Sequence, residues 1–151
     1  MQGGRRRLAA CAAAACLAAA GCGGDDGAER DRAYIEQVNV AVERFAREAA
    51  ELPSGFEAET LRTYSAALDR TAQRLRDIEP PPSVRALHEQ LAEDVAVYAD
   101  AIEEAARAPL SRDAETVVAA QQDVLRATET ANAEVNRTLQ AIGRTLDAES
   151  G

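Results

Sequence analysis

Several residue types on which protein function often depends are scarce in this chain. It has no tryptophan, three tyrosines, two phenylalanines, a single histidine and three cysteines in 151 residues. So few aromatic rings argue against a large aromatic ligand pocket. One histidine cannot supply the two Glu-x-x-His motifs of a ferritin-like di-iron site, and no Cys-x-x-Cys-His stretch is present for haem attachment. Runs typical of β-strands are also missing, which points to a helical fold.

All three cysteines fall within the first 22 residues, in a segment with the layout of a secretory signal. Three arginines, Arg5 to Arg7, precede 13 apolar residues from Leu8 to Ala20, and small residues lead to Cys22. A positive start, an apolar centre and a small-residue cleavage site define such signals. The apolar stretch is too short for a membrane-spanning helix, which needs about 20 residues. We therefore expect residues 1–21 to be removed on export.

The cysteine that follows Ala19-Ala20-Gly21 resembles the lipobox of bacterial lipoproteins. In that family the cysteine thiol receives a diacylglycerol and becomes the first residue of the mature chain. The lipobox usually has Leu, Val or Ile three residues before the cysteine, where this chain has Ala19, with Leu17 five residues before it. An ordinary secretory signal, cleaved without lipid attachment, is the alternative. The resemblance implies lipidation of Cys22, a flexible tether over residues 22–29, and a place at the extracytoplasmic face of the cell membrane.

Negative charge dominates the remainder of the chain. From residue 22 onward there are 14 arginines, no lysine and 26 acidic residues, a net charge of −12. Such a surface repels nucleic acid, so we expect no nucleic-acid partner. Because no cysteine follows Cys22, the mature chain has no internal disulfide and its stability must come from core packing.

Four segments after the tether repeat the apolar spacing of a helix, and proline or glycine separates them. Connections this short force neighbouring helices to run antiparallel. The sequence therefore predicts an all-α fold, an up-down-up-down four-helix bundle over residues 30–147, followed by a disordered tail at 148–151. The helices are expected at about 28–51, 56–78, 84–108 and 111–146.

Apolar residues in these segments recur every three or four positions, as in helices packed at coiled-coil angles. Ser83 and Ser111 stand where the third and fourth helices need N-caps. Gly143 is expected to fray the end of the fourth helix. The positions expected to face the core are Ile35, Val38, Val42, Phe45, Ala49 and Leu52; Leu61, Tyr64, Leu68, Leu75 and Ile78; Val84, Leu87, Leu91, Val95, Tyr98 and Ile102; and Val118, Leu125, Val135, Leu139, Ile142 and Leu146.

The fourth helix is expected to be the longest. At 1.5 Å per residue, its roughly 36 residues span about 54 Å, whereas the second and third helices cover about 35 Å. Either its end projects from the bundle, where a partner or a second copy can dock, or the helix breaks near Thr128 to Asn132.

The stretch IEPPPSVRALHEQL, residues 78–91, resembles a recurring pattern in small exported bacterial lipoproteins of actinobacterial type. In those proteins a helix that ends at two prolines is followed by a helix containing a Leu-His pair. The resemblance covers one helix-turn-helix unit. It implies an exported helical domain and brings no biochemical activity with it.

Two polar features could carry chemistry, and each has a structural alternative. No nucleophile elbow accompanies His88, so we expect this histidine to pack, partly buried, beside the three prolines; a metal-binding or pH-sensing role is the alternative. Four carboxylates on one side of the third helix are expected to form a solvated face, with a weak divalent-cation site as the alternative. They are Glu89, Glu93, Asp100 and Glu104.

Gln121, Thr128 and Asn132 interrupt the apolar seam of the fourth helix. Polar residues within a seam can fix the register of a helix against its neighbours, and we favour this explanation. Alternatively, they line a polar cavity for a small ligand.

These observations predict a membrane-anchored extracytoplasmic lipoprotein that is not an enzyme and uses no cofactor or metal. We expect it to act as a helical binding module, an adaptor or accessory subunit with a protein partner in the cell envelope. A sensor domain for a small solute or ion, using the polar residues of the fourth helix or the acidic face, is the alternative.

Overall fold

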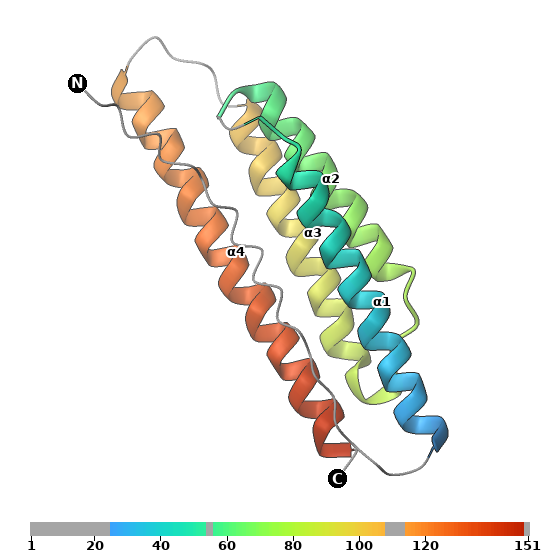
Figure 1. Cartoon of the computed structure of the whole chain (residues 1–151). Coiled ribbons are helices and arrows are strands. Elements are labelled where there is room, and N and C mark those ends of the chain that lie inside the picture. Colours follow the sequence, from blue (N-terminus) through green and yellow to red (C-terminus); the bar gives the residue numbers. More distant parts are fainter. Residues whose placement is uncertain (1–24, 54–55, 108–113, 150–151) are drawn as a thin grey trace, which may run out of the picture.

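A computed structural model describes residues 25–53, 56–107 and 114–149 of the chain (Figure 1). No strand occurs within these ranges, so the predicted all-α class is confirmed. The elements, in chain order, are α1 (Asp25–Ala50), α2 (Ala58–Arg76), the 3₁₀ turn η1 (Pro82–Val84), α3 (Arg85–Arg107) and α4 (Ala114–Glu149).

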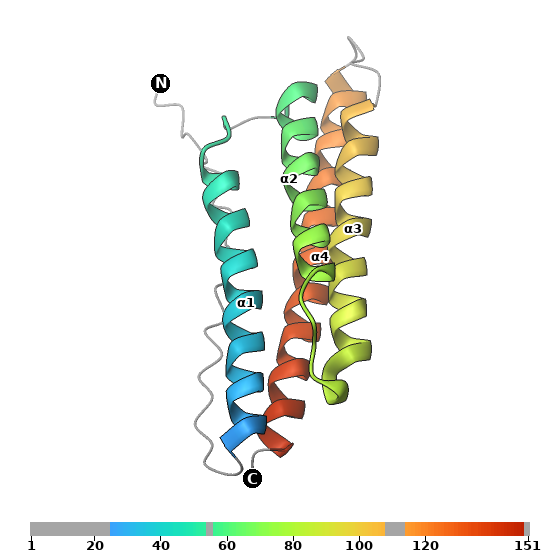
Figure 2. The same ribbon diagram turned by 90° about the vertical axis from the view of Figure 1, so that its right-hand side faces the viewer.

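The helices form an up-down-up-down bundle, as predicted (Figures 1 and 2). The most extensive packing is between α2 and α3, while α4 packs on α3 and α1 packs on α2. The start of α1, the prolines Pro80 to Pro82 and the end of α4 lie together at one end, which we call the triproline end. The end of α1 and the start of α4 lie at the opposite end, the far end, and both views show these two helices diverging toward it.

An apolar core runs through the bundle and contains most of the predicted positions. Burial of each large side chain contributes about 1.5–3 kcal/mol, before the cost of ordering it is subtracted. Small residues are buried on both helices of the closest pair, with Ala72 on α2 and Ala99 on α3 each 1% exposed. The largest fully buried side chains come from all parts of the bundle: Tyr34, Val38, Leu75, Val84, Leu91, Ile102 and Ile142.

The prediction that Val118 and Leu125 face the core is wrong. These side chains are 50% and 41% exposed, while Val124 and Ala131 are buried in their place. The reason is the divergence of α1 from α4 at the far end, which leaves one flank of α4 uncovered there. Four residues predicted to face the core at this end are also only partly buried, namely Val42, Phe45 and Ala49 of α1 and Leu52, which follows α1.

The helix ends also differ from the predictions. The expected tether is helical from Asp25 onward, and the expected tail is helical as far as Glu149. The fourth helix neither breaks near residues 128–132 nor frays at Gly143, because Gly143 is buried and α4 continues past it. The end of α4 does not project alone from the bundle. The start of α1 lies beside it and also extends beyond the connection between α2 and α3 at the triproline end (Figure 1).

Ser83 does not cap the third helix. It lies inside η1, where Val84 N–H donates to the Pro81 carbonyl at 3.1 Å, and within the described residues the Ser83 hydroxyl is buried without a hydrogen bond. Prolines fix the backbone angle φ, and this rigid turn replaces the expected cap. Ser111, the other expected cap, lies outside the described residues, as does Cys22.

A pair of leucine substitutions tests this assignment of core and surface. Leu91 is 1% exposed, and we expect Leu91→Ala to lower the free energy of unfolding by about 2–5 kcal/mol because it leaves a cavity. Leu125→Ala, the same change at an exposed position, should alter it by less than about 0.5 kcal/mol. Urea unfolding followed by circular dichroism measures both. Equal losses would show that α4 packs with Leu125 inward.

Candidate functional site

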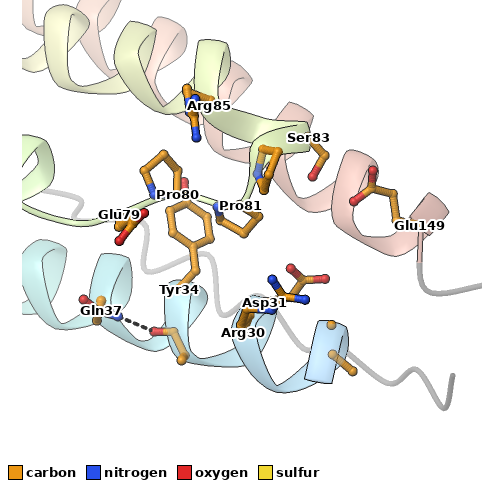
Figure 3. A pocket seen from close by; sticks show the side chains of 14 residues that line it. Arg30, Asp31, Tyr34, Gln37, Glu79, Pro80, Pro81, Ser83, Arg85 and Glu149 are labelled. Atoms are coloured by element: carbon orange, nitrogen blue, oxygen red, sulfur yellow. Dashed lines mark hydrogen bonds between the residues drawn. The ribbon is translucent and has the colours of Figure 1, made fainter. Parts of the chain in front are cut away.

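A groove of about 770 Å³ lies at the triproline end of the described chain (Figure 3). Three elements form it: the first turns of α1, the segment that joins α2 to α3, and the end of α4. We call it the triproline groove. Its lining residues are Gly27, Ala28, Arg30, Asp31, Ala33, Tyr34, Gln37, Glu79, Pro80, Pro81, Pro82, Ser83, Arg85 and Glu149.

Charges of both signs surround an apolar wall of prolines in this groove. Figure 3 shows Arg85 on one side of the prolines, Arg30 and Asp31 on the α1 side, and Glu79 and Glu149 at opposite ends. Because proline has no N–H and a fixed φ, the proline wall is rigid and donates no hydrogen bonds. Such a groove offers charged groups of both signs and an apolar wall, which suits a small zwitterion or a short charged peptide.

Behind the groove, His88 connects three helices. Its Nδ1 lies 3.1 Å from the Tyr34 hydroxyl of α1, and its Nε2 lies 2.8 Å from the Leu75 carbonyl oxygen of α2. A carbonyl can only accept, so Nε2 carries the proton and Nδ1 accepts from Tyr34. His88 is 3% exposed and packs beside the prolines, as the structural explanation expects. No cluster of three potential metal ligands occurs among the described residues.

Tyrosines and a threonine continue the contacts between helices toward the far end. The Tyr64 ring of α2 packs edge-on against Phe45 of α1 at 5.6 Å and against Tyr98 of α3 at 6.1 Å. The Tyr98 hydroxyl then donates to Thr128 Oγ1 of α4 at 2.9 Å. Side chains from all four helices therefore form one connected row across the bundle. The sequence shows these aromatic residues but not their alignment, which depends on the rotation of each helix.

The phenols of buried Tyr34 and partly buried Tyr64 are disfavoured as anions. Burial raises the pKa of Tyr34 to about 12. The pKa of Tyr64 is also raised, first by burial and then by the neighbouring Tyr98. Both hydroxyls therefore stay protonated at neutral pH, and Tyr34 remains a hydrogen-bond donor to His88.

An ion-pair cluster joins α1 to α2 on the outside of the bundle. Glu48 accepts hydrogen bonds from Arg70 at 2.8 Å and Arg74 at 2.9 Å, and Arg44 lies 3.5 Å away on its own helix. The pKa of the Glu48 carboxyl is lowered, chiefly by the hydrogen bond from Arg70, with partial burial opposing the shift. The carboxylate thus holds α1 against α2 near the far end.

The polar residues predicted on α4 do not gather into one site. The Thr128 hydroxyl accepts from Tyr98 and donates to the Val124 carbonyl at 2.8 Å, so its bonds are internal. Asn132 is exposed and Gln121 is partly buried. These placements support a structural role for Thr128 rather than a polar cavity.

The four carboxylates predicted to form an acidic face on α3 are all exposed. Of these, Glu93 pairs with Arg76 of α2 at 3.5 Å. A solvated face is what the sequence predicted, and exposed carboxylates on a regular helix lack the loop carbonyls typical of calcium sites.

The Tyr34–His88 contact makes a testable contribution to stability. Tyr34→Phe removes the hydroxyl and leaves Nδ1 of buried His88 without a donor, which should cost about 1–3 kcal/mol near neutral pH. Because the folded-state pKa of Tyr34 is raised, its contribution is complete below pH 10 and is lost as the pH rises toward 12. Tyr34→Phe should therefore lose less stability than the natural chain over that window. Urea unfolding at several pH values measures this, and parallel curves would contradict it.

None of the described helices is long and apolar enough to cross a membrane. Comparisons of the chain with protein-family models, with curated proteins and with solved structures find no match.

Proposed function

We propose that this chain is a lipid-anchored helical interaction module at the extracytoplasmic face of the cell membrane, an adaptor or accessory subunit and not an enzyme. The signal-like residues 1–21 and the position of Cys22 support the anchor. The run of three arginines, an apolar stretch and small residues that ends at Cys22 carries the proposal furthest. If Cys22 is the anchor, α1 begins only three residues after it, at Asp25.

An anchor so close to a helix limits how the bundle can stand on the membrane. Three peptide units from Cys22 to Asp25 reach at most about 11 Å. The triproline end would therefore lie close to the lipid head groups, and the far end would stand at most roughly 39 Å higher, the length of the 26 residues of α1. A bundle held within this distance of the membrane suits a subunit that contacts a membrane complex.

The interior of the bundle supports a binding role over catalysis. Both ring nitrogens of the only histidine are engaged, with Tyr34 and with the Leu75 carbonyl. The buried hydroxyl of Ser65 donates to the Ala99 carbonyl at 2.9 Å, and that of Thr138 donates to Asp94 at 3.1 Å. These groups connect helices and are not presented to a substrate.

Substitution of single cysteines tests the anchor. In cells fed an alkyne analogue of palmitate, the natural chain should take up label and sediment with membranes. Cys22→Ala should lose both properties, because the thiol that would form the lipid bond is absent. Cys16→Ala, a cysteine inside the expected signal, is the matched control and should behave as the natural chain does. Label retained by Cys22→Ala, or a natural chain that is released without label, would rule out the lipid anchor.

A solute sensor is a second candidate, favoured by the size and mixed charge of the triproline groove. A ligand present at 100 times its Kd would stabilise the fold by about 2.7 kcal/mol. The melting midpoint of the natural chain should then rise when a zwitterionic solute such as an amino acid is added. The rise should be smaller in Arg85→Gln than in the control Arg62→Gln, because Arg62 does not line the groove. If no solute in a metabolite panel shifts the midpoint, the sensor candidate fails.

A further inference from the structure

The Glu48 carboxylate holds more arginines than its own charge can neutralise. Arg70 and Arg74 of α2 donate to its two oxygens at 2.8 and 2.9 Å, and Nε of Arg44 on α1 lies 3.5 Å from it. We call these four side chains the Glu48 cluster. Because a guanidinium group is always charged in proteins, three arginines and one carboxylate leave a surplus of two positive charges.

Such a surplus is unusual for this chain, whose net charge from residue 22 onward is −12. In the ion pairs found elsewhere among the described residues, one arginine meets one carboxylate, as in Arg76–Glu93. Glu51 and Asp77 each lie three residues beyond a member of the cluster. Both are exposed, where water screens their charge, and neither pairs with the cluster within the described structure. The cluster is therefore a local basic site on an acidic molecule.

The cluster also has more hydrogen-bond donors than acceptors. Each guanidinium group has five N–H donors, whereas one carboxylate accepts about four hydrogen bonds. Nη1 of Arg74 is buried and finds no acceptor among the described residues. Arg44 and Arg70 are 60% and 49% exposed, so donors on both remain open to solvent. An oxygen-rich anion at this surface would meet donors that Glu48 leaves unused.

The spacing of these arginines suits a single phosphate group. Because Arg70 and Arg74 contact the two oxygens of one carboxylate, their guanidinium groups lie within the span of one anion. Arginine binds phosphate through paired N–H···O bonds. A phosphate monoester has a charge of about −1.5 to −2 at pH 7, which matches the surplus of two. A phosphodiester, the form found in most lipid head groups, has a single negative charge and matches it less well.

We propose that the Glu48 cluster binds the phosphate group of a small soluble phosphate monoester between α1 and α2. The phosphate oxygens would accept hydrogen bonds from the solvent-facing N–H groups of Arg44 and Arg70, while Glu48 keeps the arginines in position. Since these arginines come from both helices, the bound phosphate would hold α1 against α2 and stabilise the folded chain. The site is separate from the triproline groove, and its binding does not depend on the lipid anchor.

Thermal unfolding of the purified full chain tests this proposal, with methyl phosphate as the probe. Sodium chloride keeps the ionic strength constant, so that general screening does not change between samples. We expect the melting midpoint to rise with the methyl phosphate concentration, because the ligand binds only the folded chain. Dimethyl phosphate has the same phosphorus centre but one charge fewer, and it should give a much smaller rise. The dependence of the midpoint on concentration gives an apparent Kd.

A matched pair of arginine substitutions places the effect at the cluster. Arg70→Gln should weaken the apparent affinity for methyl phosphate by about tenfold, because it removes a charge-assisted hydrogen bond and half of the surplus charge. Arg76→Gln is the control, since Arg76 is on the same helix and also pairs with a neighbouring helix, through Glu93 at 3.5 Å, but lies outside the cluster. Exposed ion pairs contribute little to stability, so both variants should fold. If Arg70→Gln does not fold, Arg44→Gln replaces it, because Arg44 makes only the 3.5 Å contact.

Three results would overturn the proposal. No rise in the natural chain would leave the cluster as a link between helices and nothing more. An equal rise in Arg70→Gln and Arg76→Gln would indicate a general effect of phosphate on protein stability. An equal rise with methyl phosphate and dimethyl phosphate would show that the site does not select a dianion.

Discussion

The hydrogen bonds of one imidazole set the geometry of this bundle. His88 of α3 accepts a hydrogen bond from the Tyr34 hydroxyl of α1 and donates one to the Leu75 carbonyl of α2, so three helices meet at a single buried point beside the prolines. Loss of either hydrogen bond would leave a buried polar group unpaired and would lower the free energy of unfolding. The two bonds therefore constrain the positions of the three helices relative to one another. No comparable buried contact between α1 and α4 is found at the far end of the described chain. There α1 is held to α2 by Glu48 and by the Phe45–Tyr64 ring contact, and α4 is left to diverge from it.

Much of this fold follows from residue spacing, and the departures from prediction have a common cause. The number, order and direction of the helices could be predicted because proline and glycine interrupt a regular apolar repeat. Burial could not be predicted at every position, because it depends on which neighbour a flank meets. Leu125 and Leu139 look equivalent in the sequence, yet the first is 41% exposed and the second 8%. The helical start at Asp25 was missed because Gly27 and the neighbouring aspartates are typical of a loop.

The candidate sites were harder to predict than the fold. Tyr34 was overlooked because a tyrosine among charged residues resembles a surface position, and its partner His88 is 54 residues away. The triproline groove requires α1, the proline turn and the end of α4 to meet, and no local pattern indicates that meeting. Thr128, in contrast, was found on α4 as a break in the seam, and its bond to Tyr98 matches the structural explanation.

The orientation of α1 has a mechanical consequence. A pull on a residue just before Asp25 acts along the axis of α1 and away from the bundle, so it slides α1 past its antiparallel neighbour α2. Such a shearing load is shared by several contacts at once, since Tyr34, Phe45 and Glu48 all join α1 to other helices. A pull at right angles to that axis would instead break these contacts one after another. A bundle attached at Cys22 would thus bear tension in its stronger direction.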